Sequence, residues 1–205
     1  MRMLLALFAV MLLFGCSPPT EKQYSVIGYA MARGRVSSAF YLSHQGKTYL
    51  VTARHVVEDN LSETITDIDD AAVFLTESVN DAYSVSKEAI PFGLLPKDAP
   101  RDIPVTIYGF YRGEKISTKG FVCGRVIYPE PPLDLIYLTA PMYPGMSGGP
   151  VVGQDGCVIG VAAAILTPLS EGQAVSACTP IQRVIKMTPS AKPAPVVRNG
   201  FVVFD

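Results

Sequence analysis

The sequence lacks an excess of charge, a long apolar run and paired cysteine spacing, and each lack excludes a class of protein. Lys and Arg number 17 against 18 Asp and Glu, a net charge of −1. That balance excludes a basic nucleic-acid-binding surface, because phosphate binding needs clustered cations. No apolar run reaches the ~18–20 residues that a permanent membrane-spanning helix needs. Cys-x-x-Cys spacing is also missing, so the sequence predicts no zinc site and no other metal.

The residues that are plentiful are apolar residues and turn formers. Hydrophobic residues make up 49% of the chain and charged residues 17%, which is too apolar for a disordered protein. Gly and Pro number 17 each, and this favours many short strands over long helices. The length of 205 residues suggests one domain of generous size or two small lobes packed as one unit.

Residues 1–15 have the pattern of a secretory signal peptide. A positive start at Arg2 is followed by the apolar run 4–14, which is too short to span a membrane. Residues 16–23 are polar after their first residue and are interpreted as a linker between this segment and the folded domain.

The end of the apolar run, Leu13-Phe14-Gly15-Cys16, resembles the lipobox of bacterial lipoproteins, although Phe14 departs from the small or aliphatic residue usual there. In that family the Cys is acylated and becomes the mature N-terminus. The resemblance implies an exported protein that is lipid-anchored through Cys16 on the periplasmic face of the cell envelope. In a Gram-negative host, Ser17 favours the outer membrane. An ordinary signal peptide with an incidental Cys is the alternative.

Three further cysteines, Cys123, Cys157 and Cys178, follow in the body of the chain. In an oxidising compartment an odd number allows one bridge and one free thiol, with three possible pairings. Buried, inert thiols are the alternative.

Residues 24–187 alternate short apolar or β-branched runs with turns, which predicts roughly ten to twelve strands in an all-β barrel or sandwich. The expected strands are 26–31, 38–42, 47–52, 71–76, 105–111, 120–128, 133–140, 150–152, 158–166 and 173–178. Only 56–60 and 180–187 look helical. Residues 188–205 form a proline-rich C-terminal tail that ends in a last apolar run.

Two short motifs carry the chemistry. Thr52-Ala53-Arg54-His55-Val56 follows a strand-like run, and Gly145-Met146-Ser147-Gly148-Gly149-Pro150 precedes one. In this order they resemble the His and Ser motifs of chymotrypsin-like (trypsin-like) serine peptidases. The stretch 105–126 is similar to the start of the second barrel in the HtrA-like branch of that family.

This resemblance covers about residues 24–187. It implies an all-β fold of two packed antiparallel six-stranded β-barrels, divided near 95–104, with a short C-terminal helix. The active cleft would lie between the barrels.

The residue types suit nucleophilic catalysis. A serine hydroxyl is a poor nucleophile until a base such as His takes its proton, and a buried carboxylate fixes the imidazole tautomer. By resemblance, Ser147 is the nucleophile and His55 the base. The backbone amides of Gly145 and Ser147 would form the oxyanion hole.

The third member of the triad comes from an acidic run. Asp70-Ala71-Ala72-Val73 is similar to the Asp-Leu-Ala-Val stretch that supplies the family's catalytic Asp, and this assigns Asp70. Asp69 is the near rival and Asp67 a distant one. Asp134 has a superficially similar context, but it precedes the strand that leads to Ser147, where the family has no triad member.

Specificity and regulation rest on the same resemblance. Ala162, Ala163, Ala164 and Ile165 would lie beside the primary pocket, with no acidic residue to receive a basic side chain. The sequence therefore predicts a small or medium apolar residue before the scissile bond. Met146 stands where digestive members carry an Asp that pairs with a freed N-terminus, so that activation mechanism is not expected. The residues after the last predicted strand are too few for the PDZ domain of typical HtrA-like proteins.

The sequence thus predicts an exported, lipid-anchored, trypsin-like serine endopeptidase that works through a Ser-His-Asp triad and an acyl-enzyme, without a cofactor. Its expected partners are a protein or peptide substrate and the membrane that holds Cys16, with no nucleic acid; the oligomeric state stays open. Two alternatives remain. One is a catalytically inactive peptidase-fold module that binds peptides by strand addition. The other is a narrow-specificity or self-processing serine hydrolase.

Overall fold

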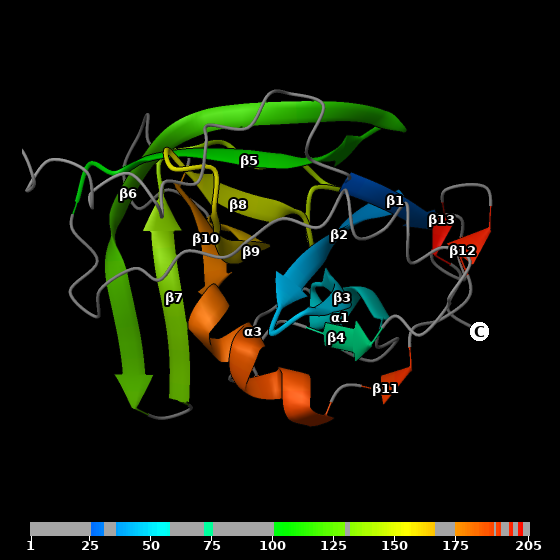
Figure 1. The fold of residues 1–205 in the computed structure, drawn as a ribbon. Helices are drawn as coiled ribbons and strands as arrows, with labels where there is room; N and C mark the ends of the chain where they lie inside the picture. The colour runs from blue at the N-terminus through cyan, green and yellow to red at the C-terminus, as the bar shows by residue number, and fades with distance from the viewer. Residues whose placement is uncertain are drawn as a thin grey trace, which may run out of the picture.

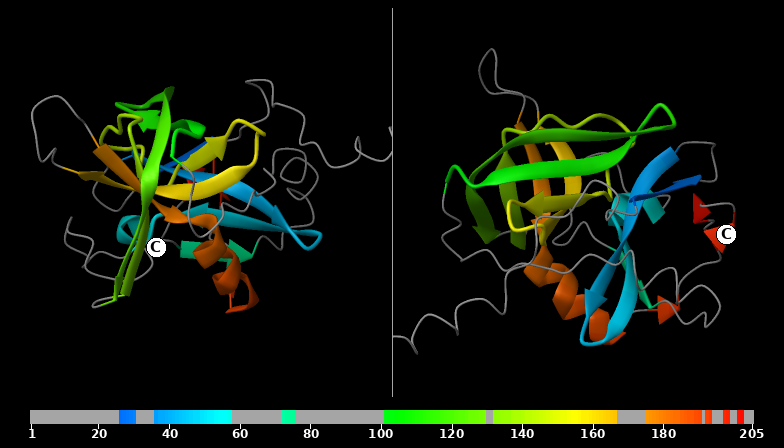
Figure 2. Two further views of the ribbon diagram at one scale, coloured as in Figure 1. Left: turned by 90° about the vertical axis from the view of Figure 1, so that its left-hand side faces the viewer. Right: turned by 45° about the horizontal axis from the view of Figure 1, so that its top comes forward.

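The computed structural model describes residues 26–30, 36–57, 72–75, 101–129, 132–166, 175–190, 192–193, 197–198 and 201–202. These residues form two β-structures that lie side by side (Figures 1 and 2). The N-terminal half supplies four of the five strands of a sheet, the C-terminal half supplies a barrel, and the helix α3 lies at one end of both.

The N-terminal sheet has five strands in the order β1-β2-β3-β4-β11. Its strands are β1 (Val26–Ala30), β2 (Val36–His44), β3 (Lys47–Thr52), β4 (Ala72–Leu75) and β11 (Lys192–Pro193). The β2–β3 hairpin turns through Gln45 and Gly46, whose φ angles of 50° and 72° are those of a two-residue turn that matches the twist of paired strands. All strand pairs in this sheet are antiparallel except β4 with β11, which is parallel.

The C-terminal half closes into a six-stranded barrel in the order β10-β7-β6-β5-β8-β9, antiparallel throughout. Its strands are β5 (Pro104–Tyr111), β6 (Glu114–Pro129), β7 (Pro132–Leu138), β8 (Pro150–Gly153), β9 (Val158–Leu166) and β10 (Val175–Pro180). The long β6 pairs first with β5 and then with β7, and a bulge between Val122 and Gly124 separates the two parts.

Three helical turns and a small hairpin complete the described structure. Their bounds are α1 (Arg54–Val57), α3 (Ile181–Met187), the 3-10 turn η2 (Thr188–Ser190), β12 (Val197–Arg198) and β13 (Phe201–Val202). The strands β12 and β13 pair with each other, and β13 contacts β1.

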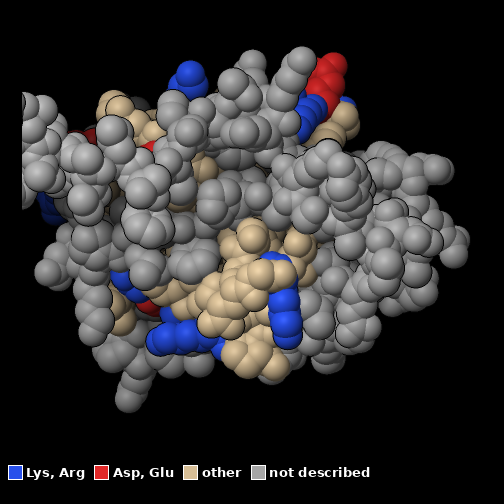
Figure 3. Space-filling view, in the orientation of Figure 1, with Lys and Arg blue, Asp and Glu red and all other residues tan. Residues whose placement is uncertain are grey.

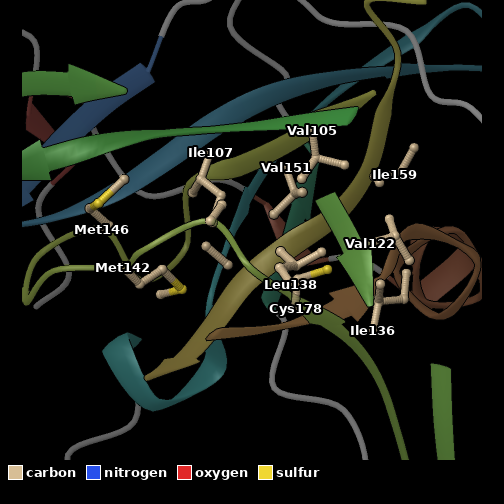
Figure 4. Close-up of a cluster of buried hydrophobic side chains, with 12 residues drawn as sticks. Val105, Ile107, Val122, Ile136, Leu138, Met142, Met146, Val151, Ile159 and Cys178 are labelled. Carbon is tan, nitrogen blue, oxygen red and sulfur yellow. The ribbon is translucent and has the colours of Figure 1, made fainter. Parts of the chain in front are cut away.

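Alternation of apolar residues along the strands produces two hydrophobic clusters. The first fills the barrel and contains Val105, Ile107, Val122, Ile136, Leu138, Ala140, Met142, Met146, Val151, Ile159, Ala162 and Cys178 (Figure 4). The second joins the two halves, because Phe40 and Val51 of the sheet pack with Val158 of the barrel and Ile181 of α3. Each such buried side chain contributes about 1.5–3 kcal/mol relative to exposure, so the second cluster fixes the sheet against the barrel.

The prediction of a mostly β chain with an antiparallel six-stranded barrel and a short C-terminal helix is confirmed. For the N-terminal half, the described strands form a five-stranded sheet. Segments 58–71 and 76–100, which hold most of the rest of that half, lie outside the described residues, as does the 1–25 segment with Cys16.

Several element boundaries differ from expectation by one or two residues, and the start of β6 differs most. The strand expected at 120–128 begins at Glu114, because the β5–β6 ladder continues through a mostly polar segment up to a tight turn at Arg112 and Gly113, with φ of 51° and 85°. The expected helix 56–60 begins earlier, at Arg54, and residues beyond Val57 lie outside the described part.

Cys123, Cys157 and Cys178 are all free thiols, which favours the alternative without a disulfide among them. Cys157 and Cys178 are buried. Burial raises the pKa of the Cys178 thiol well above its ordinary value, and burial is also the first cause of the raised pKa of Cys123.

Surface charge agrees with the balanced composition. On the face shown in Figure 3, the described Lys and Arg side chains stand at separate places rather than in one broad patch. Among the described residues, no helix is long and apolar enough to cross a membrane.

Candidate active site

His55 lies on α1, the short turn that follows β3 directly. Ala53 and Val56, its neighbours, are buried at 0% and 4% exposure, and the Val56 amide donates to the Ala53 carbonyl at 3.2 Å. His55 itself is half-buried. The buried neighbours therefore hold the backbone of this turn while the imidazole keeps partial access to solvent.

Ser147 lies in the loop between β7 and β8, half-buried. Two hydrogen bonds within the loop stabilise it. The Met146 amide donates to Tyr143 O and the Gly149 amide donates to Met146 O, both at 3.0 Å. The side chain of Met146 is fully buried and belongs to the barrel cluster, at the edge nearest Met142 in Figure 4. The buried Met146 side chain thus anchors the loop to the barrel core.

Two glycines give this loop its shape. Gly145 has φ +102° and Gly148 has φ +85°, conformations that side chains with a Cβ rarely adopt. A Cβ on Gly148 would overlap Ser38 O and Thr52 Oγ1 and would lie 2.8 Å from Ala53 N. Only glycine lets the Ser147 loop approach the end of β3 so closely.

Hydrogen bonds join the Ser147 loop to the strands that lead to His55. The Ser147 carbonyl accepts from Ser38 N at 3.0 Å and from Ser37 Oγ at 2.9 Å, and the Gly145 carbonyl accepts from Ser38 Oγ at 2.7 Å. Thr52, three residues before His55, donates its hydroxyl to Ser38 O at 2.8 Å. The structure therefore brings the Ser147 loop close to the end of strand β3, which His55 follows. Ser147 and His55 are 92 positions apart in the sequence.

The amides expected to form the oxyanion hole belong to this loop. Within the described part of the chain, neither the Gly145 nor the Ser147 amide donates a hydrogen bond. Both carbonyls of these residues, in contrast, are held by β2.

Asp70, Asp69 and Asp67 lie outside the described residues. The nearest described residue is Ala72, which pairs with Thr52 across β4 and β3.

Asp134 forms an ion pair with Arg125. Its carboxylate accepts two hydrogen bonds from Arg125 across β6 and β7, at 2.7 Å from Nε and 2.6 Å from Nη2, and the two side chains are only 11% and 9% exposed. The hydrogen bond to Asp134 is the largest cause that raises the pKa of Arg125. This ion pair links the two strands of a hairpin.

The expected specificity residues line one stretch of β9. Ala162 exchanges hydrogen bonds with the loop, donating to Gly149 O at 2.8 Å and accepting from Gly148 N at 2.7 Å. Exposure then rises along the strand, from 0% at Ala162 to 54% at Ile165. The structure thus brings Ala162 to the Ser147 loop and leaves Ile165 at the surface.

Sequence reasoning missed two features next to Ser147. The first is the group of buried hydroxyls on Ser37, Ser38 and Thr52, whose only signal in the sequence is their polarity inside apolar strands. The second is an aromatic contact in which Tyr111, at the end of β5, lies 5.2 Å from the ring of Tyr143. Among the described residues, no group of three or more His, Cys, Asp or Glu could hold a metal ion.

The fold agrees with comparisons to known proteins. The family model of the trypsin-like peptidase domain matches residues 37–161. Since that is more than half of the chain, the chain belongs to the trypsin-like peptidase family.

Solved structures of similar fold include HtrA-type proteases. The HtrA-type protease AlgW with a tripeptide has a TM-score of 0.61 at 20% identity, covering 82% of this chain and 61% of its own. Deg5 has a TM-score of 0.60 at 20% identity over 82% of this chain and 88% of its own. The inactive form of the Rv3671c protease, from M. tuberculosis, has a TM-score of 0.56 at 16% identity, with coverage of 87% and 98%. These likenesses concern the fold. No curated protein matches the chain.

Proposed function

We propose that this chain is an exported, lipid-anchored serine endopeptidase that cleaves peptide bonds through Ser147, His55 and Asp70. One observation carries the proposal. The Ser147 loop is hydrogen-bonded to Ser38, and Ser38 is hydrogen-bonded to Thr52, three residues before His55. This connection holds the segments that carry Ser147 and His55 together, which supports a reaction that uses both side chains.

In the proposed reaction, His55 takes the proton of the Ser147 hydroxyl as the oxygen attacks the scissile carbonyl, and later returns a proton to the leaving amine. The Gly145 and Ser147 amides stabilise the negative charge that develops on the carbonyl oxygen, an interaction worth about 10²–10³ in rate per donor. Water then hydrolyses the acyl-enzyme. No cofactor enters these steps.

Asp70 is proposed as the group that orients His55. The pairing of Ala72 with Thr52 supports this assignment, because β4 begins beside the end of β3, and α1 follows β3 directly. Asp70 is two residues before Ala72. Asp134 is the poorer candidate, since Arg125 already engages both of its carboxylate oxygens.

The proposed substrate is a protein or peptide with a small or medium apolar residue before the scissile bond. Two residues support this preference. Ala162 is small and is hydrogen-bonded to the Ser147 loop, and Ile165 is apolar and exposed. Solved structures of AlgW hold a tripeptide or a decapeptide, which agrees with peptide substrates for this fold.

Two finer parts of the proposal rest on sequence and family. The N-terminal sheet is proposed to be the described part of a second barrel, as in chymotrypsin-like peptidases. Cys16 is proposed as the lipid anchor, with residues 16–23 as the linker. We expect the Cys16→Ala variant to be lost from the membrane fraction of the cell. An unchanged distribution between the membrane and soluble fractions would refute the anchor.

Covalent labelling tests the catalytic proposal. The protein would be treated with a fluorophosphonate probe and its intact mass read beside Ser147→Ala and Asp70→Ala. We expect one adduct on the wild type, none on Ser147→Ala, and slower labelling of Asp70→Ala. A folded wild-type protein that takes no adduct would refute the enzyme and favour a peptidase-fold binding module. Unchanged labelling of Asp70→Ala would remove Asp70 from the triad.

A further inference from the structure

Ser38 is a fully buried residue of β2, and each of its polar atoms has a hydrogen-bond partner. Its amide donates to Ser147 O at 3.0 Å and its hydroxyl donates to Gly145 O at 2.7 Å. The hydroxyl oxygen also accepts from Phe110 N at 2.9 Å, and the Ser38 carbonyl accepts from Thr52 Oγ1 at 2.8 Å.

These partners come from different parts of the fold. Gly145 and Ser147 belong to the Ser147 loop and Phe110 to the barrel strand β5. Thr52 lies at the end of β3, just before His55. One side chain at 0% exposure therefore connects the half that carries His55 with the half that carries Ser147.

The hydroxyl of Ser38 binds the loop at Gly145. Gly145 has φ +102° and no Cβ, so its own conformational preference does not fix the peptide that joins it to Met146. The hydrogen bond from Ser38 holds the carbonyl of that peptide. The Ser147 carbonyl, two residues on, is held from the same strand, so β2 fixes the backbone on both sides of Met146.

We propose that Ser38 is a positioning residue for the proposed peptidase reaction. By holding the Gly145 carbonyl, its hydroxyl fixes the orientation in which the Gly145 and Ser147 amides meet the developing oxyanion. This inference rests on the proposed function. Removal of the hydroxyl leaves both the Gly145 carbonyl and the Phe110 amide without that partner in a partly buried place, and the loop then relaxes.

Ser37 supplies a matched control. It is the adjacent residue, 5% exposed, and its hydroxyl donates to Ser147 O at 2.9 Å. In Ser37→Ala that carbonyl keeps its second donor, the Ser38 amide. The control thus removes a buried hydroxyl that bonds the same loop while leaving the Gly145 peptide held.

The test compares wild type, Ser38→Ala, Ser38→Cys and Ser37→Ala in the full chain, below the melting temperature of each variant. For a chromogenic peptide substrate, we expect kcat of Ser38→Ala to fall about 10²-fold, the order of effect of losing one oxyanion donor, with KM changed less than about threefold. Ser38→Cys, which keeps a weak donor at similar size, should retain intermediate kcat. Ser37→Ala should lose less than about fivefold. Fluorophosphonate labelling rates should follow kcat.

The outcomes separate this inference from the proposed function. Equal kcat for Ser38→Ala and Ser37→Ala would overturn the positioning role while leaving the peptidase intact, as would a rise in KM at unchanged kcat. If Ser38→Ala does not fold, Ser38→Cys decides, and kcat equal to that of Ser37→Ala would overturn the role. A wild type with neither turnover nor labelling would overturn the proposed function itself.

Discussion

Removal of the Asp134 carboxylate should destabilise the barrel and leave the chemistry of each folded molecule unchanged. The side chain is 11% exposed and accepts two hydrogen bonds, at 2.6 and 2.7 Å, from a guanidinium that is 9% exposed. Hydrogen bonds to charged groups contribute about 1.5–3 kcal/mol each, and the truncation leaves the Arg125 charge without its partner in a largely buried place. Asp134→Ala should therefore lower the free energy of unfolding by about 3 kcal/mol, the low end of the sum, because the pair keeps some contact with water.

The assay is urea and thermal unfolding followed by circular dichroism, beside kcat measured at low temperature. For a chain of this length, 1 kcal/mol corresponds to about 2–4 °C in Tm, so the expected fall is about 6–12 °C. The control is the double variant Arg125→Met with Asp134→Leu. It leaves no charge unpaired and should recover much of the loss, since apolar replacement of a buried ion pair is often neutral.

The opposite result would refute a structural role for Asp134. If Asp134→Ala kept the wild-type unfolding curve and lost most of its kcat, Asp134 would act in catalysis rather than in the hairpin.

Three further predictions concern other sites. Gly148→Ala should abolish labelling of the nucleophile and lower Tm, because the new Cβ would overlap atoms of β2 and β3 and φ is +85°; wild-type labelling and Tm would contradict the close approach described. In the native protein at pH 8, mass mapping after alkylation should find Cys178 and Cys157 unmodified until denaturant is added, since both are buried and the raised pKa of Cys178 keeps its thiol protonated; rapid native labelling of Cys178 would disprove its burial. Ile165→Ser, at a side chain 54% exposed, should change stability by less than about 0.5 kcal/mol and raise KM for peptides with an apolar residue before the scissile bond, whereas an unchanged KM would remove Ile165 from the substrate site.

Much of the fold could be predicted from local sequence. Short apolar or β-branched runs between turns marked most strands, and the His and Ser motifs together, in this order, indicated the correct family. The start of β6 could not be predicted this way, because four of its first six residues (Glu114, Lys115, Ser117 and Lys119) are polar and exposed, and the backbone ladder with β5 holds them in the strand.

The site was predictable only in part. Motifs indicated His55 and Ser147, and the structure brings their segments together, while the assignment of Asp70 stays a prediction because that residue lies outside the described part. Ser38 could not be found from sequence, since its partner Gly145 is 107 positions away and the hydrogen bond exists only after both halves have packed.

The parallel pairing of β11 with β4 has a consequence for how the protein is made. Lys192 and Pro193 lie opposite Phe74 and Leu75, so the last strand of the N-terminal sheet is translated more than a hundred residues after the strand it joins. Pairings so distant along the chain form slowly. The N-terminal sheet therefore cannot be complete until residues 192–193 have been synthesised, and the β4–β11 pairing is the last pairing of that sheet to become available.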